Sequence, residues 1–217
     1  RPPILSQEFI EELERDFLKI EKSFERHKDK FESNRTHFFS YNFVFNKLFR
    51  KMQEKYPEDK KESAVMPLLW LAQKQHENWI PVAAMDHIAE ILDMPPMHVY
   101  EVATFYTMYN KKKVGKHLIQ VCATTPCWLK GSDAITTACK KHLKVDKGET
   151  TDDGEFTLME VECLGACVNA PMVQINDDYY EDLTPESMVS LLKKLKKKEK
   201  VKAGSQSGRQ CSAPQKD

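Results

Sequence analysis

The chain has 217 residues, enough for one or two domains with their own hydrophobic cores. Its 33 Lys and Arg residues balance its 33 Asp and Glu residues, so its net charge gives no global argument for binding nucleic acid or an acidic membrane. Its six cysteines are too sparse for a disulfide-stapled secreted scaffold. No apolar run reaches the roughly 18–20 residues that span a bilayer, so we expect no direct membrane insertion.

The chain begins with a predicted helix that has a narrow apolar stripe. Pro2 and Pro3 fix an extended entry, and Ser6 is a suitable N-cap for the helix that follows. From Ile10 to Phe31 the apolar residues recur in alternating steps of three and four. The other faces are charged, so this helix would bury little surface alone. We therefore expect residues 1–37 to form an arm docked on another subunit, with packing on its own domain as the alternative.

Residues 38–113 predict a helical bundle. A helix over about 41–55 ends before Pro57, because the residue preceding a proline avoids helical geometry. Three more helices are expected: one from Val65 to about His76, one opened by Pro81, and one opened by Pro95 and Pro96 that runs to about Met108. The short, proline-marked connections favour antiparallel neighbours.

Two features of this bundle have more than one interpretation. The aromatic stretch 105–109 is expected to belong to the helical core, with a binding face as the alternative. His76, His87 and His98 occur at irregular spacing. We interpret these histidines as surface or core-edge residues rather than metal ligands.

After a polar linker at residues 111–115 the hydrophobic period changes to that of strands. Strands are expected at 117–122, 156–162, 172–176 and 179–180, and helices at 131–143 and after the cap at Thr184. This order is the core arrangement of a thioredoxin-like α/β domain, here over residues 114–200. The predicted fold class is therefore α+β, with an N-terminal helical bundle followed by a thioredoxin-like domain.

The end of the chain has a different composition. Residues 201–217 are rich in Gly, Ser, Gln and Pro, which predicts a disordered tail that contains Cys211 as a free thiol. The lysine-rich run 193–200 predicts a solvated helix end, favoured by the negative end of the helix dipole, rather than a nucleic-acid patch. Cys139 lies on or near the inward side of its helix and is expected to be a buried small residue.

Two cysteine pairs carry the candidate chemistry. In the first pair, Cys122-x4-Cys127, four residues separate the thiols; in the second, Cys163-x3-Cys167, three do, and each pair follows a predicted strand. Disulfides within the pairs would close short loops of little entropic value, and dithiol catalysis normally uses CxxC. Four thiols at neighbouring strand ends instead favour a metal site, either a [2Fe–2S] cluster or a structural zinc ion. The wider first pair favours the cluster, and zinc remains the alternative.

The chain has no GxGxxG motif and no P-loop. A nucleotide-binding Rossmann loop is therefore not expected. If the chain serves a dehydrogenase, the nicotinamide and flavin chemistry belong to a partner.

Several segments together resemble a known family. They are Cys122-x4-Cys127, Cys163-Leu-Gly-Ala-Cys167-Val-Asn-Ala-Pro-Met, Tyr56-Pro57, the run 63–69 and the run 102–106. They are similar to the 24 kDa [2Fe–2S] subunit family of respiratory complex I, and the similarity extends from about residue 40 to about residue 196. All four cysteine positions of the family are filled.

The resemblance implies that Cys122, Cys127, Cys163 and Cys167 bind one [2Fe–2S] cluster and that the chain has no catalytic residue of its own. It implies a one-electron carrier subunit of NADH:ubiquinone oxidoreductase, paired with a large flavoprotein that holds NADH and FMN and with other peripheral-arm subunits. The expected location is the matrix side of the mitochondrial inner membrane, and the start at Arg1 fits a processed form. The alternatives are a diaphorase subunit of an NAD-linked hydrogenase or formate dehydrogenase, and a non-redox adaptor held by zinc.

Overall fold

The computed structural model describes Met52 and residues 54–212. The chain divides into two compact units, Arg1–Lys111 and Lys112–Asp217, each of which is described by itself. The predicted arm over residues 1–37 and most of the helix predicted over 41–55 lie outside the described residues. Within the described part, no helix is both long enough and apolar enough to cross a bilayer.

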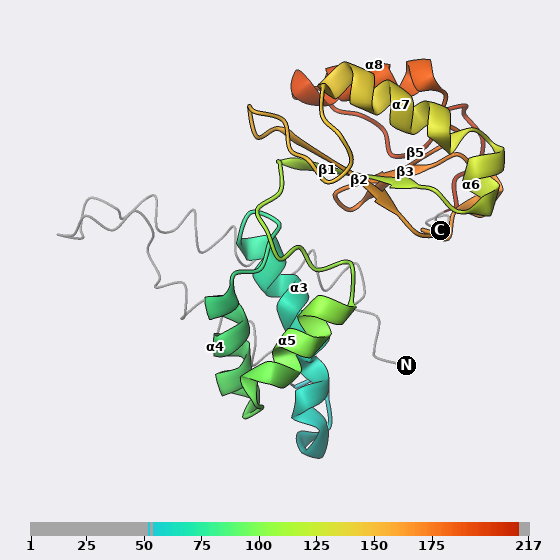
Figure 1. The fold of residues 1–217 in the computed structure, drawn as a ribbon. Coiled ribbons are helices and arrows are strands. Elements are labelled where there is room, and N and C mark those ends of the chain that lie inside the picture. The colour runs from blue at the N-terminus through green and yellow to red at the C-terminus, as the bar shows by residue number, and fades with distance from the viewer. Residues whose placement is uncertain (1–51, 53, 213–217) are drawn as a thin grey trace, which may run out of the picture. The chain divides into compact units, whose positions relative to one another are not determined.

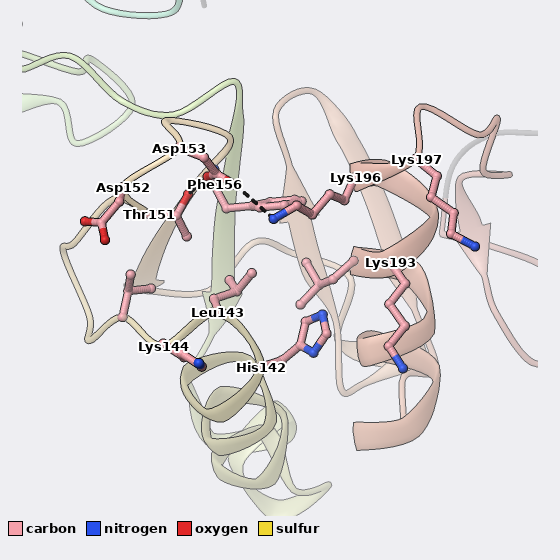
Figure 2. A pocket seen from close by; sticks show the side chains of 12 residues that line it. His142, Leu143, Lys144, Thr151, Asp152, Asp153, Phe156, Lys193, Lys196 and Lys197 are labelled. Carbon is pink, nitrogen blue, oxygen red and sulfur yellow. Dashed lines mark hydrogen bonds and ion pairs between the residues drawn. The ribbon is translucent and has the colours of Figure 1, made fainter.

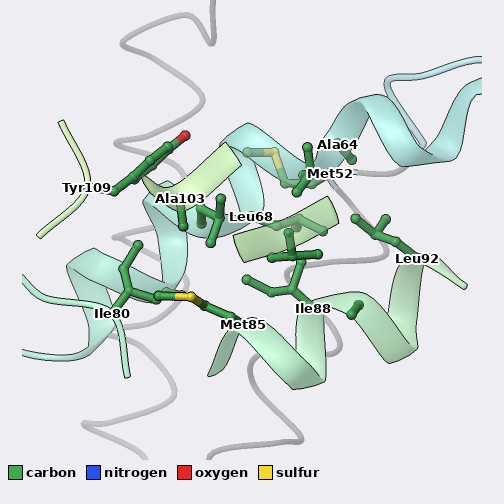
Figure 3. Close-up of a cluster of buried hydrophobic side chains, with 14 residues drawn as sticks. Met52, Ala64, Leu68, Ile80, Met85, Ile88, Leu92, Ala103 and Tyr109 are labelled. Atoms are coloured by element: carbon green, nitrogen blue, oxygen red, sulfur yellow. The ribbon is translucent and has the colours of Figure 1, made fainter. Parts of the chain in front are cut away.

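The first unit is helical (Figure 1). A 3-10 segment, η2 (Glu58–Ala64), is followed by α3 (Val65–Gln75), α4 (Val82–Leu92) and α5 (Pro96–Phe105). Pro81 caps α4 and Pro96 is the first residue of α5, as their fixed backbone angle predicts. The fully buried side chains include Met52, Leu68, Ile88 and Ala103, which face one another inside the bundle (Figure 3).

The prediction for the aromatic stretch 105–109 was wrong in its main part. Helix α5 ends at Phe105, which is 78% exposed, and Tyr106 and Met108 are also exposed. Only Tyr109 is buried, and its hydroxyl donates to the Met66 carbonyl at 2.9 Å. The buried Gln73 amide holds the same segment, since it donates to the Met108 carbonyl at 3.0 Å. The chain after α5 is thus pinned by one aromatic ring and by polar contacts, which helical periodicity does not reveal.

The second unit contains a five-stranded sheet in the order β2-β1-β3-β4-β5. Its strands are β1 (His117–Cys122), β2 (Phe156–Val161), β3 (Val173–Ile175), β4 (Asp178–Glu181) and β5 (Gly204–Ser205). Strand β1 is parallel to β2 and antiparallel to β3, and β3 forms a hairpin with β4. The first four strands lie where the sequence predicted them, and the α+β architecture is confirmed.

Two helices lie side by side over one face of this sheet (Figure 1). They are α7 (Ser132–Leu143) and α8 (Pro185–Lys196), and α8 starts with a capping box between Thr184 and Ser187. Alternate strand residues such as Ile119, Leu158 and Val173 pack against the helices in one buried cluster. This core fixes the strands, and with them the segments that leave the strand ends.

The outer edge of β2 is covered by the segment that precedes it. The Gly148 amide donates to the Leu158 carbonyl at 2.7 Å, and the Leu158 amide donates to the Glu149 carbonyl at 3.1 Å. Thr150 also forms an isolated antiparallel bridge with Thr157. These bonds pair backbone groups that an open edge strand would expose.

The prediction of a disordered tail over 201–217 is corrected for residues 201–212. Strand β5 pairs in parallel with β4, with Tyr180 opposite Gly204 and Glu181 opposite Ser205. The Gln206 amide also donates to the Glu181 carbonyl at 2.9 Å. Composition alone indicated disorder, because it does not report that a sheet edge is available to order a short polar segment. Residues 213–217 lie outside the described part.

Gly115 lies in the predicted linker just before β1, and a substitution there tests how closely the chain packs at the start of β1. It is buried, and a Cβ there would lie 2.7 Å from the Phe156 carbonyl carbon. We expect Gly115→Ala to destabilise the second unit by about 1–3 kcal/mol, because backbone atoms must move apart. Faster amide hydrogen exchange in β1 and β2 would report this loss. The exposed Lys112→Ala serves as the control, with an effect within about 0.5 kcal/mol. Equal exchange in the two variants would contradict the prediction.

Candidate cluster-binding site

The parallel pairing of β1 and β2 brings the two cysteine pairs to one end of the sheet. Cys122 is the last residue of β1, and its register partner Val161 is the last residue of β2. Cys163 follows Val161 by two residues. Since parallel strands end at the same edge of a sheet, the two cysteine segments leave it side by side. The sequence predicted this meeting from the strand positions alone.

A short helix that the sequence analysis missed positions the first pair. Helix α6 (Thr125–Leu129) contains Cys127, has Thr124 as its N-cap residue and has Pro126 in its first turn. A threonine followed by a proline is a helix-start signal that could have revealed it. The thiols of Cys122 and Cys127 are fully buried, in a small apolar cluster with Ala166 and Met172.

The second pair lies in a tight loop. The sulfurs of Cys163 and Cys167 are 3.5 Å apart. Gly165 between them has a φ of +86°, a backbone conformation that side chains rarely adopt. The loop continues into a single 3-10 turn, η3 (Cys167–Asn169). Cys163 is exposed and Cys167 is half-buried, so the second pair is the open side of the site.

Hydrogen bonds and burial lower the pKa of two of the four thiols and raise the pKa of the other two. The Gly165 amide donates to Cys163 and lowers the pKa of that thiol, with smaller contributions from Cys167 and Thr124. Burial of Cys122 raises its pKa, but donation from the Thr124 hydroxyl and from backbone amides outweighs burial, so the pKa of Cys122 is lowered. Burial raises the pKa of Cys127 to about 12, and the Cys163 side chain raises that of Cys167.

The site therefore has the donors that a metal–sulfur group needs, and it lacks one component, positive charge. Each thiol shifts the pKa of at least one neighbouring thiol, so four thiolates would repel one another strongly. A metal bound among these thiols would supply the compensating charge, and Cys122, Cys127, Cys163 and Cys167 would give up their protons to hold it. In the described part of the chain, no three His, Cys, Asp or Glu side chains are close enough to hold one ion.

Thr124 is a site residue that the sequence analysis did not single out. Its hydroxyl lies 3.4 Å from the Cys122 sulfur and also interacts with Cys163, so it contacts both pairs. Hydrogen bonds of this kind stabilise the added negative charge on a reduced metal–sulfur group. A threonine after a strand end predicts a helix cap more readily than a sulfur donor, which is why the pattern did not reveal it.

Cys139, Cys211 and the three histidines of the helical bundle, all among the described residues, lie apart from the two cysteine pairs. Cys139 is fully buried on α7, and burial raises its pKa to about 12, which fits its interpretation as a small core residue. Cys211 lies in the residues after β5 and is half-buried. His76 and His87 are half-buried in the first unit and His98 is exposed, so all three lie at the surface or the core edge.

A basic pocket of about 550 Å³ lies elsewhere in the second unit, between the ends of α7 and α8 and the turn before β2 (Figure 2). It is lined by His142, Lys193 and Lys196, among others, and Lys196 pairs with Asp153 at 2.9 Å. Phe156, the first residue of β2, also lines it, so the length of β2 separates the pocket from the cysteines. The lysines occupy the C-terminal ends of two helices, where positive charge is favoured by the helix dipole. This arrangement agrees with the predicted solvated helix end.

Comparison with known proteins agrees with this geometry. Residues 49–196 match the thioredoxin-like [2Fe-2S] ferredoxin family. The chain is 57% identical over 159 residues to an NADH-quinone oxidoreductase subunit of Rickettsia bellii, across 71% of this chain and 95% of that protein. It is 53% identical over 162 residues to the mitochondrial NADH dehydrogenase [ubiquinone] flavoprotein 2 of Dictyostelium discoideum, across 75% of this chain and 66% of that protein.

A solved structure shares the fold at lower similarity. An NAD+-reducing [NiFe]-hydrogenase in its H2-reduced state aligns with a TM-score of 0.54 and 17% identity, over 62% of this chain and 22% of the hydrogenase chain. At this identity the likeness concerns the fold alone.

A helical unit followed by a thioredoxin-like unit with paired thiols at its strand ends fits an iron–sulfur electron carrier, and the family match identifies that class. The chain belongs to the thioredoxin-like [2Fe-2S] ferredoxin family. This confirms the resemblance, the fold class and the expectation of one [2Fe–2S] cluster over the zinc alternative.

The opposite pKa shifts predict an order of thiol reactivity in the metal-free chain. Cys163 is exposed and its pKa is lowered, so more of it is thiolate near pH 7.5 and it is alkylated first. Cys127 and Cys139 are fully buried, each with a pKa raised to about 12, and they react last. Peptide mass mapping during iodoacetamide treatment measures the order. Alkylation of Cys139 as fast as Cys163 would contradict these environments.

Proposed function

We propose that Cys122, Cys127, Cys163 and Cys167 bind one [2Fe–2S] cluster, and that the chain is the one-electron carrier subunit of an NADH:quinone oxidoreductase. The observation that carries this proposal is the pair of dithiol segments held at one sheet edge in a member of a [2Fe-2S] ferredoxin family. The names of the Rickettsia and Dictyostelium relatives support the assignment to such a complex. When bound, the cluster accepts and returns one electron at a time without needing a proton or a substrate.

The chain's own residues hold the iron in a shielded but reachable position. The buried pair, Cys122 and Cys127, anchors the group in the interior, and the pair of Cys163 and Cys167 closes it from the open side. Backbone amides of Gly165 and Met172 and the hydroxyl of Thr124 donate to the sulfurs. These donors stabilise the reduced state, and burial opposes them, so the balance between the two sets the reduction potential.

The partner in this proposal is a large flavoprotein that binds NADH and FMN, as the family resemblance implies. Three apolar side chains next to the cysteines favour a docking surface there. Trp128 and Leu129 follow Cys127, Val168 follows Cys167, and all three are strongly exposed. Exposed apolar groups close to a redox centre are typical of a surface that a partner covers. Such coverage would also exclude water and bring the electron donor near the sulfurs.

The mitochondrial designation of the Dictyostelium relative supports a place in mitochondria, and we propose the matrix side of the inner membrane within the peripheral arm of the complex. A diaphorase role in an NAD-linked hydrogenase or formate dehydrogenase is the second candidate, which the family resemblance implies; the hydrogenase structure shares the fold alone. Purification of the native complex separates the two, since the catalytic subunits that accompany the flavoprotein differ.

Metal analysis and one substitution test the ligand assignment. The purified holo-chain is expected to contain about two iron and two acid-labile sulfide per chain and to give an electron paramagnetic resonance signal on reduction. Cys163→Ser is expected to lose most of the visible absorbance while the helical first unit is retained. Cys139→Ala is the matched control, because it removes a buried thiol outside the site and should keep the cluster. One zinc per chain with no visible absorption, or full cluster in Cys163→Ser, would refute the assignment.

Charged substitutions at the apolar surface test the docking proposal. Leu129→Asp or Val168→Asp is expected to weaken association with the flavoprotein by about tenfold or more, because a charge would be buried against the partner. Iron content should stay unchanged, since neither side chain is a sulfur donor. Ser190→Asp adds the same charge at an exposed position of α8 and is expected to leave association as it was. Affinity capture with titrated flavoprotein measures the effect, and unaltered binding of both variants would rule this surface out.

A further inference from the structure

The residues that follow α8 turn back to the cysteine loop. We define residues 204–212 as the strap and residues 163–172 as the second cysteine loop. The family match ends at residue 196, so the strap lies outside the matched region. The strap pairs with β4 through β5 and then folds back on itself. A Cβ on Gly204 would lie 2.9 Å from the Cys211 Cβ, which shows how closely its two ends pack.

Two acidic residues at the end of β4 fasten the strap. Asp182 accepts hydrogen bonds from Ser205 Oγ at 2.5 Å and from Arg209 Nη1 at 2.8 Å, and its side chain is only 10% exposed. Glu181 is 1% exposed, and its carboxylate accepts from the Ser212 amide at 3.0 Å and from the Ser212 hydroxyl. A buried carboxylate is costly unless donors surround it, so the strap supplies what Glu181 needs.

Asn169 joins this arrangement to the second cysteine loop. Its side chain is 2% exposed, and Nδ2 donates to Glu181 Oε2 at 2.7 Å and to the Gln210 carbonyl at 2.7 Å. Its backbone carbonyl accepts from the Asp182 amide at 2.8 Å. Asn169 therefore contacts β4 and the strap at the same time, two residues after Cys167 and three before Met172.

The effect of the Asn169 contact depends on Cys167 and Met172, which lie on either side of it in the sequence. Cys167 is one of the four proposed ligands, and the Met172 amide donates to the Cys127 sulfur. Because the segment is short and tightly turned, a displacement of Asn169 would move the Cys167 sulfur. It would also move the Met172 amide, which donates to the Cys127 sulfur. Residues that contact metal ligands, without contacting the metal, orient those ligands and so affect how tightly the metal is bound.

We propose that the strap, acting through Glu181 and Asn169, holds the second cysteine loop in the geometry that retains the cluster. Glu181 and Asn169 are positioning residues, and neither contacts iron. The proposal rests on the proposed function for the identity of the ligands. It adds that a segment outside the matched family region is required for full cluster retention.

Two shortened chains test the role of the strap. A chain that ends at Ala203 lacks the strap, whereas a chain that ends at Pro214 keeps it and is the matched control. With the cluster bound, bleaching of the visible absorbance by an iron chelator is expected to be about tenfold faster or more in the first chain and unchanged in the second. The same rate in both chains would overturn the proposal.

A substitution pair tests the polar contact itself without changing chain length. Asn169→Asp places a second carboxylate against Glu181, so the two groups repel and the loop moves. Adding Glu181→Gln restores a donor and an acceptor between positions 169 and 181 with the original net charge, but position 169 still cannot donate to the Gln210 carbonyl. We expect Asn169→Asp to broaden the electron paramagnetic resonance signal of the reduced cluster and to speed cluster loss, and the double variant to recover part of both because the bond to the Gln210 carbonyl stays broken. A merely structural role would lower stability without changing the signal of the cluster that remains bound, so an unchanged line width in Asn169→Asp would overturn the positioning role.

The metal-free chain provides a readout that does not depend on iron. Amide hydrogen exchange at residues 166–172 is expected to rise about tenfold in the chain that ends at Ala203, while exchange in β1 and β2 stays as in the full chain. Equal protection of residues 166–172 would overturn the strap proposal even if the cluster binds. If no chain binds iron, the proposed function fails, and this exchange measurement still decides whether the strap holds the loop.

Discussion

The parallel register of β1 and β2 is the constraint on which the site depends. Cys122 ends one strand opposite Val161 at the end of the other, so the two loops that carry the thiols must leave the sheet at one edge. An antiparallel pairing would place the two segments at opposite edges of the sheet, about the length of a strand apart. The crossover through α7 makes the parallel arrangement possible, and the buried cluster under α7 and α8 keeps it in register.

Charge imposes the second constraint. Four neighbouring sulfurs cannot all be ionised unless a cation lies among them. In the metal-free chain the Gly165 amide lowers the pKa of Cys163, whereas burial raises the pKa of Cys127. The fold prepares the ligands with donors aimed at sulfur, but it leaves protons on the buried thiols for iron to displace. In the proposed site, the buried pair Cys122 and Cys127 holds the metal in the interior. The pair Cys163 and Cys167 lies on the open side, where a partner can approach.

Much of this arrangement could be predicted from the sequence, because it follows from local pattern. The positions of β1, β2 and α8 follow from periodicity and caps, and the four cysteines follow from spacing after strands. What the pattern could not reveal depends on distant contacts. Phe105 and Tyr106 have helical spacing, yet both are exposed, because the contacts of Tyr109 with Met66 and of Gln73 with Met108 hold the chain after α5 with only Tyr109 in the core. Residues 204–212 look disordered by composition, yet the edge of β4 and the carboxylates of Glu181 and Asp182 order them.

The segment around Gly148 and Glu149, which covers the outer side of β2, bears on how the chain behaves before it joins a complex. A subunit of a large complex is synthesised alone and must wait for its partners without pairing with copies of itself. The bonds from Gly148 and to Glu149 occupy the outer side of β2 at Leu158, and β5 occupies the outer side of β4. Part of the outer side of β2 and part of the outer side of β4 are thus covered, which leaves fewer backbone groups open to strand addition by a second molecule.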